Sequence, residues 1–211
     1  MIPTNLPARA LLLVMFAWSG VGTVMAIEEP GYAVVEKSGD FELRLYEPYI
    51  VAETVVDGTF DDVGSEAFDR LGGYIFGNNR SRTSIDMTAP VTQTPASERI
   101  AMTAPVSQTQ RDGEWRVTFT MPAGYTMQTL PEPIDTRVLL KQQPGRLVAA
   151  IRYSGTWARE RYEAHERQLE SMIAERGLRP VGDPIFARYN SPFSLWFLRR
   201  NEVLIPVERQ G

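Results

Sequence analysis

Two segments that lie 97 residues apart, VAETVVDGTF at 51–60 and VAAIRYSGTW at 148–157, share one pattern of residues. Valine, alanine, glycine and threonine coincide, and an aromatic residue closes each segment. The same offset aligns the pairs Glu66–Glu163, Ala67–Ala164 and Arg70–Arg167. Seven matches at one offset indicate an internal duplication, in which each half runs from a strand through a Gly-Thr-aromatic turn into a helix.

Helical spacing follows each of the two turns. In the segment 60–77 the positions of one face are 60, 63, 67, 68, 71 and 75, and in 156–177 they are 162, 165, 169, 172 and 173. Residues at this spacing share one side of a helix, so the sequence predicts one helix in each half. Gly177 stands just past the second helix, where glycine commonly ends a helix.

Alternation of apolar and polar residues dominates the rest of the chain and predicts antiparallel strands. The segments with this character are 41–46, 49–56, 115–121, 137–140, 146–153, 185–189 and 202–207. We therefore predict an α+β fold in which two strand–helix–strand halves, about 30–125 and 126–208, form a distorted antiparallel β-barrel flanked by two helices. A cleft between a helix and the sheet is the expected ligand site.

A second, shorter repeat lies inside the first half. IDMTAPVTQT at 85–94 and IAMTAPVSQT at 100–109 agree at eight of ten positions. Pro90 and Pro105 cannot donate a hydrogen bond to a sheet, so each copy is expected at a strand end, an edge or a bulge.

The first 26 residues are typical of a secretory signal peptide. Arg9 precedes the apolar run ALLLVMFAW, and Val24-Met25-Ala26 fits the small-residue cleavage rule. We predict export, to a bacterial periplasm, of a single domain at 27–211 with no membrane span after cleavage. The alternative is an uncleaved N-terminal membrane anchor.

Composition excludes several classes of function. The net charge is −4 and the basic residues are not clustered, so no nucleic-acid partner is expected. There is no cysteine, which removes thiolate nucleophiles, thiolate metal ligands and disulfides. Neither a nucleophile elbow, a phosphate loop nor an HExxH motif occurs, so no catalytic residue is predicted.

An ordered set of blocks resembles the SOUL haem-binding protein family. The blocks are FELRLYEP, LGGYIFGNN, MTAPV, FTMPAGYTMQTLPEPID, YSGTW and RYNSPFSLWFLRRNEVLIPV, and they span 31–207. The resemblance implies a duplicated β-barrel with two helices. It also implies reversible, non-enzymatic binding of haem or a related tetrapyrrole on an apolar cleft, as a carrier, buffer or sensor.

The candidate binding residues follow from what a porphyrin needs, which is apolar surface for its faces and cations for its propionates. The resemblance implies that the first helix and the segment 190–200 are the pocket walls. The candidates are Phe68, Arg70, Leu71, Met87, Phe193, Trp196, Arg199 and Arg200. The aromatic residues of 190–200 fit a pocket wall and ordinary packing equally well.

His165 is the one histidine and the candidate axial iron ligand. The competing interpretation is a structural histidine that bonds a backbone carbonyl or a carboxylate. The resemblance does not carry over a histidine ligand, because Leu45 stands at the family position where one was suggested.

Two other functions fit the same pattern. One is an effector-binding module for flat apolar cations, which would place a glutamate in the cleft. The other is an enzyme acting on tetrapyrroles or hydrophobic esters, which would need a convergent acid–base pair.

Overall fold

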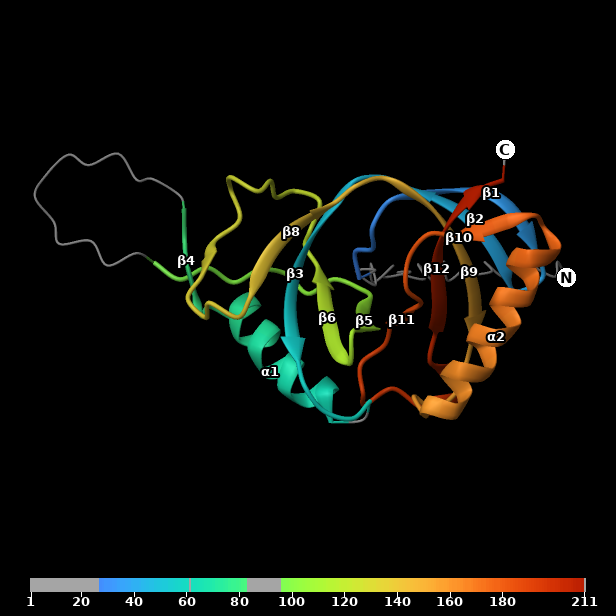
Figure 1. Cartoon of the computed structure of the whole chain (residues 1–211). Coiled ribbons are helices and arrows are strands. Elements are labelled where there is room, and N and C mark those ends of the chain that lie inside the picture. Colours follow the sequence, from blue (N-terminus) through green and yellow to red (C-terminus); the bar gives the residue numbers. More distant parts are fainter. Residues whose placement is uncertain (1–26, 61, 83–95, 211) are drawn as a thin grey trace, which may run out of the picture.

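The computed structural model describes residues 27–60, 62–82 and 96–210 (Figure 1). Among these ranges, no helix is long and apolar enough to cross a membrane. The predicted signal peptide at 1–26, Met87 and the first copy of the short repeat lie outside the described residues.

The elements follow the predicted order of strands and helices. They are β1 (Tyr32–Ser38), β2 (Phe41–Tyr46), β3 (Tyr49–Val56), α1 (Val63–Ile75), β4 (Asn79–Arg80), β5 (Val106–Arg111), β6 (Glu114–Thr120), β7 (Glu132–Pro133), β8 (Leu139–Gln143), β9 (Arg146–Tyr153), α2 (Arg159–Glu175), β10 (Leu178–Pro180), β11 (Ile185–Arg188), the 3-10 helix η1 (Trp196–Leu198) and β12 (Asn201–Arg209). β5 begins directly after Pro105, which confirms the expected strand end. Gly177, with φ +62°, follows α2 as predicted.

One antiparallel sheet of ten strands forms the body of the protein, so the α+β class is confirmed. Its strands pair in the order β1-β2-β9-β12-β11-β5-β6-β3-β8, and β10 pairs with the end of β12. The two end strands do not pair with each other, so the sheet is strongly curved but open, and it matches the predicted distorted barrel only loosely. Both edges carry charged residues, such as Glu36 and Lys37 on β1 and Lys141 on β8, which suits strands that end a sheet.

When β1 is set aside, the sheet consists of two series of four strands with the same arrangement. The series β2-β9-β12-β11 and β8-β3-β6-β5 meet where β11 pairs with β5. In each series the second strand leads into a helix. A duplicated chain would give this order; the duplication and its half boundaries stay predictions.

Both helices lie on the outer face of the curved sheet (Figure 1). α1 contacts β3 and β6, whereas α2 contacts β9, β10 and β12. The buried stripe of α1 includes Ala67, Leu71 and Tyr74, and that of α2 includes Leu169 and Ile173. The main apolar core lies between these stripes and the outer face of the sheet.

Alternation along the strands gives the sheet two different faces. On β3, Ala52 and Val56 enter the main core, whereas Val51 and Glu53 face the hollow on the inner side. The same alternation continues through β6 and β9. Successive side chains of a strand point to opposite faces. The helices cover one face of the sheet, and the other face is open to solvent or to a ligand.

A buried ion network ties β2, β11 and β12 together on the inner side. Arg44 donates from both terminal nitrogens to Glu202, at 2.6 and 3.0 Å, and Arg200 donates to the same carboxylate at 3.0 Å. Tyr189 donates its hydroxyl to Glu202 at 2.8 Å. Burial raises the pKa of Glu202, but the hydrogen bonds and charges of the two arginines outweigh it and hold that pKa below its usual value.

We predict that Glu202→Gln lowers the free energy of unfolding by about 3–5 kcal/mol, because it removes the buried carboxylate that Arg44 and Arg200 share and leaves them only the more exposed Glu42 and Glu29. The measurement is urea unfolding at neutral pH. Since the folded-state pKa is lowered, the stabilisation is present above about pH 4.3 and is lost as the pH falls through the folded-state value.

Glu208→Gln is the matched control, because Glu208 pairs with Arg179 at the exposed end of β12 and such pairs contribute about 1 kcal/mol or less. Equal losses in the two variants would show that the buried network does not stabilise the fold.

Candidate functional site

The predicted residues of α1 point in different directions. Phe68 is 39% exposed, and its ring centroid lies 5.5 Å from that of Phe119 on β6. Leu71 is 0% exposed and belongs to the main core, so it cannot line a surface cleft in this conformation. Of the apolar pair predicted on this helix, only Phe68 offers surface to a ligand.

Arg70 is already bonded within the protein. Its guanidinium donates to the backbone oxygen of Val55 at 2.8 Å and to the Thr54 hydroxyl at 3.4 Å, and it also pairs with Glu66. These contacts hold α1 against β3. A ligand carboxylate would have to replace them before it could bind Arg70.

The segment between β11 and β12 carries a run of exposed apolar side chains. Their exposed fractions are Phe193 95%, Leu195 59%, Trp196 57%, Phe197 51% and Leu198 66%. The Trp196 and Phe197 rings meet edge to face at 5.6 Å. We call residues 193–198 the apolar loop. An exposed cluster of this kind marks a binding surface more often than a structural one.

Sequence reasoning identified Phe193 and Trp196 but missed Leu195 and Leu198. The signal was the run FSLWFL, which has neither the alternation of a strand nor the spacing of a longer helix. A run with neither period leaves several apolar side chains without a core to enter.

Arg199 shapes the apolar loop and is not a free cation. It donates to the backbone oxygens of Ser194 at 3.0 Å and Pro192 at 2.7 Å. Its guanidinium carbon also lies 4.2 Å from the centre of the Trp157 ring. Arg199 therefore closes the loop on itself and anchors it to the turn before α2.

Arg200 points instead to the inner side of the sheet. It pairs with Glu29 at 2.8 Å and with Glu202 at 3.0 Å, and it stacks over Tyr189 at 3.7 Å. The structure thus separates Arg200 from the apolar loop, although the two are neighbours in sequence.

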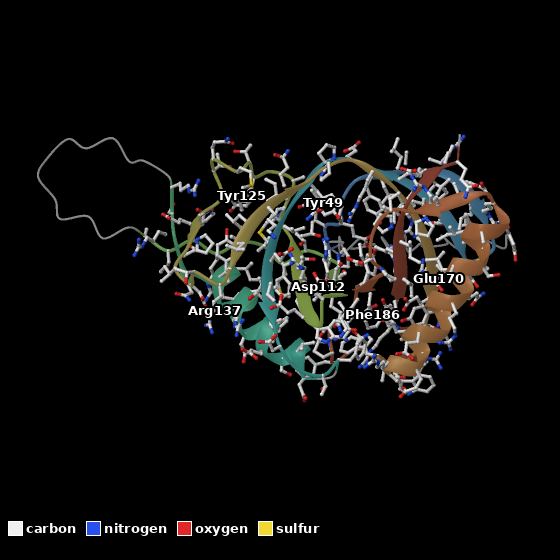
Figure 2. The ribbon with its side chains drawn as sticks, in the orientation of Figure 1. Tyr49, Asp112, Tyr125, Arg137, Glu170 and Phe186 are labelled. Atoms are coloured by element: carbon white, nitrogen blue, oxygen red, sulfur yellow. The ribbon has the colours of Figure 1, made fainter. Side chains whose placement is uncertain are left out.

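Arg188 lies among the aromatic residues near the starts of the two helices, and sequence reasoning missed it. Its guanidinium lies 4.9 Å from the Trp157 ring and 5.7 Å from the Phe60 ring, so it bridges the aromatic residues that close the two 97-residue-spaced segments. It also lies beside Gly64 in the first turn of α1, 3.5 Å from where a Cβ would stand. The third ring against it, Phe186, lies between the two helices in the view of Figure 2.

His165 adopts the geometry of a structural histidine. Its Nδ1 lies 2.6 Å from the backbone oxygen of Arg161, one helical turn earlier, and a proton on Nδ1 makes this a hydrogen bond. The imidazole stacks on Tyr153 at 3.8 Å with an interplanar angle of 13°. Within the described ranges there is no group of three or more metal-ligating His, Asp or Glu side chains.

The inner face of the sheet encloses a hollow of about 410 Å³. Glu53 lies in its wall with a side chain 8% exposed, and one of its oxygens, Oε1, accepts from Lys141 at 2.6 Å and from Arg116 at 3.3 Å. This is the buried carboxylate that a binder of flat cations would require. Two cations already neutralise it.

Comparison with known proteins gives the family. The model of the family described as "SOUL heme-binding protein" matches residues 27–206. The chain belongs to this family. Human "Heme-binding protein 2" is 25% identical over 193 residues, covering 84% of this chain and 88% of the relative, and the mouse protein of the same name is 25% identical over 194 residues with the same coverage.

Solved structures confirm the α+β fold of this SOUL-family protein. The EcmrR C-terminal domain superposes with a TM-score of 0.59 at 10% identity, covering 85% of this chain and 99% of that one. A hydrolase from Listeria innocua gives a TM-score of 0.54 at 13% identity, covering 82% and 94%. At these identities the likeness concerns the fold alone.

We predict that Arg199→Ala speeds chymotrypsin cleavage within the apolar loop by about tenfold, because two backbone hydrogen bonds and the contact with Trp157 are lost. Mass spectrometry of the fragments locates the cuts. Arg179→Ala, which removes an exposed arginine from β10, is the control and should cleave like the unaltered protein. Equal cleavage of all three proteins would show that Arg199 does not order the loop.

Proposed function

We propose that this protein is a non-enzymatic binder of haem or a related tetrapyrrole, acting as a carrier, buffer or sensor. Membership of the SOUL haem-binding family carries the proposal. The chemistry of the apolar loop supports it, because five large apolar side chains there are more than half exposed.

The apolar loop suits the face of a flat macrocycle. Trp196 and Phe193 offer aromatic surface on which a tetrapyrrole ring can pack. Burial of each of these side chains contributes about 1.5–3 kcal/mol to the free energy of binding. Phe68 on α1 adds a further exposed aromatic residue to the proposed surface, beside the three of the apolar loop. Bound there, a tetrapyrrole would present its faces to the loop and leave its propionates in solvent, where they need no protein partner.

The arginines predicted for the propionates have other roles in this arrangement. Arg70 and Arg199 each bond backbone oxygens, and Arg200 pairs with Glu29 and Glu202. They order the walls of the site. His165 is not part of the proposed contact, because its Nδ1 and one ring face are already used.

We also propose that residues 1–26 direct export to a bacterial periplasm and are then removed, on the strength of the sequence pattern at Arg9 through Ala26. Mass spectrometry of the protein recovered from its native host should then find an amino terminus at Ile27. Retention of Met1 in a membrane fraction would support the anchor instead.

Titration of the mature protein with haemin tests the binding proposal. We expect a saturable change of the Soret band at micromolar haemin. The double variant Phe193→Ser/Trp196→Ser should weaken binding by about tenfold or more, because it removes the largest aromatic area of the loop.

Leu139→Ser is the control for that pair, since Leu139 is 48% exposed on the edge strand β8 and should bind haemin unchanged. A lack of saturation would reject haem binding, and equal affinity of the double variant would reject the apolar loop as its place.

We predict that His165→Ala leaves the Soret maximum of the haemin complex unchanged, because Nδ1 is bonded to the Arg161 carbonyl oxygen and the ring packs on Tyr153. The circular-dichroism spectrum of the variant checks that the helix is retained. A shifted Soret maximum in a folded variant would assign the axial ligand to His165 after all.

A further inference from the structure

We propose that the hollow on the inner face of the sheet is a second binding site, selective for a small aromatic carboxylate. The hollow has a volume of about 410 Å³, which is within the range of ligand sites. It lies on the opposite face of the sheet from the helices. The proposal therefore does not depend on haem binding at the apolar loop.

The charge of the hollow is positive although the protein is acidic. The charged residues in its wall are the cations Arg111, Arg116, Lys141 and Arg146 and the anions Glu53 and Asp183. Four positive and two negative charges leave +2 locally, against −4 for the whole chain. A concave site with one sign of charge concentrates ligands of the opposite sign.

Glu53 holds Lys141 and Arg116 in position but does not neutralise both of their charges. Lys141 and Arg116 both donate to the same oxygen, Oε1 of Glu53. The arrangement holds two long, flexible side chains in place on β6 and β8. Glu53 adds one negative charge to the hollow, and an excess of positive charge remains.

Two arginine N–H groups of the hollow have no acceptor among the described residues. They are the Nε atoms of Arg116 and Arg146, and both are buried. A buried donor without an acceptor is unfavourable, and a charged one more so. Guanidinium groups match the two oxygens of a carboxylate in geometry and charge, so the arginines that line the hollow favour a carboxylate ligand.

The rest of the wall is suited to an apolar ring. Tyr46 and Tyr49 lie with ring centroids 6.1 Å apart, and Tyr49 stands on β3 as Figure 2 shows. The aliphatic side chains that line the hollow are Val51, Val148, Val181, Ile185 and Leu204. The combination of aromatic residues, aliphatic residues and arginines favours a molecule with a single ring or two fused rings and a carboxylate.

A pair of probes of equal size and opposite charge tests the assignment. 2-Naphthoate carries the carboxylate, and 2-naphthylmethylammonium carries a cation on the same ring system. In calorimetric titrations of the full mature chain we expect saturable binding of 2-naphthoate and none of the ammonium compound.

Substitutions in the hollow should change naphthoate binding in known directions. Arg116→Gln and Arg146→Gln should each weaken it by about tenfold, as expected for loss of a charged hydrogen bond. Glu53→Gln should strengthen it, because the one buried negative charge is removed. Arg179→Gln, at an exposed site on β10, should leave it unchanged.

Several results would overturn the proposal. Preference for the ammonium compound, with loss of binding in Glu53→Gln, would make the hollow a site for cations. Unchanged naphthoate affinity in both arginine variants would place the anion elsewhere. Loss of naphthoate binding in Phe193→Ser/Trp196→Ser would place it at the apolar loop, whereas failure of haemin binding alone would leave this site untouched.

Discussion

The two-sidedness of a β-strand is the constraint on which the rest of this protein depends. Ten strands in one curved sheet give every second side chain to the outer face and the others to the inner face. The outer residues, such as Ala52 and Phe119, pack beneath α1 and α2 and form the main core. The inner residues cannot share that core, so they form a polar hollow with a smaller apolar cluster and a buried ion network. Both proposed binding surfaces follow from this division.

The inner face remains ordered because its charges are paired. Glu202 is 0% exposed and accepts hydrogen bonds from Arg44, Arg200 and Tyr189, which belong to three different strands or their ends. Glu53 has the same role at the other end of the sheet, between Lys141 and Arg116. Buried ion pairs add less stability than apolar packing, but breaking one is costly. The inner face is thus fixed in shape.

Much of the fold could be predicted because the spacing of apolar residues differs between helices and strands. Both helices and seven of the strands were predicted from spacing, whereas β1, β4, β7 and β10 were not. Gly177 and Pro105 marked boundaries through their own backbone chemistry. The open edges could not be predicted, since pairing between β1 and β8 depends on the curvature of the whole sheet.

The candidate site was harder to predict than the fold. Arg70, Arg199 and Arg200 were read as cations available to a ligand, yet each has acceptors that lie far away in sequence or in the backbone. Sequence spacing carries no information on such partners, and for the same reason it missed Arg188 and the cations around Glu53.

We propose that tetrapyrrole binding takes place at the apolar loop and α1 and leaves the inner hollow free. Hydrogen–deuterium exchange of the mature protein, with and without haemin, tests it most directly. We expect slower exchange of the backbone amides in residues 189–200 and in α1, with β3, β6 and β9 unchanged. Slower exchange confined to β3, β6 and β9 would instead place haemin in the hollow.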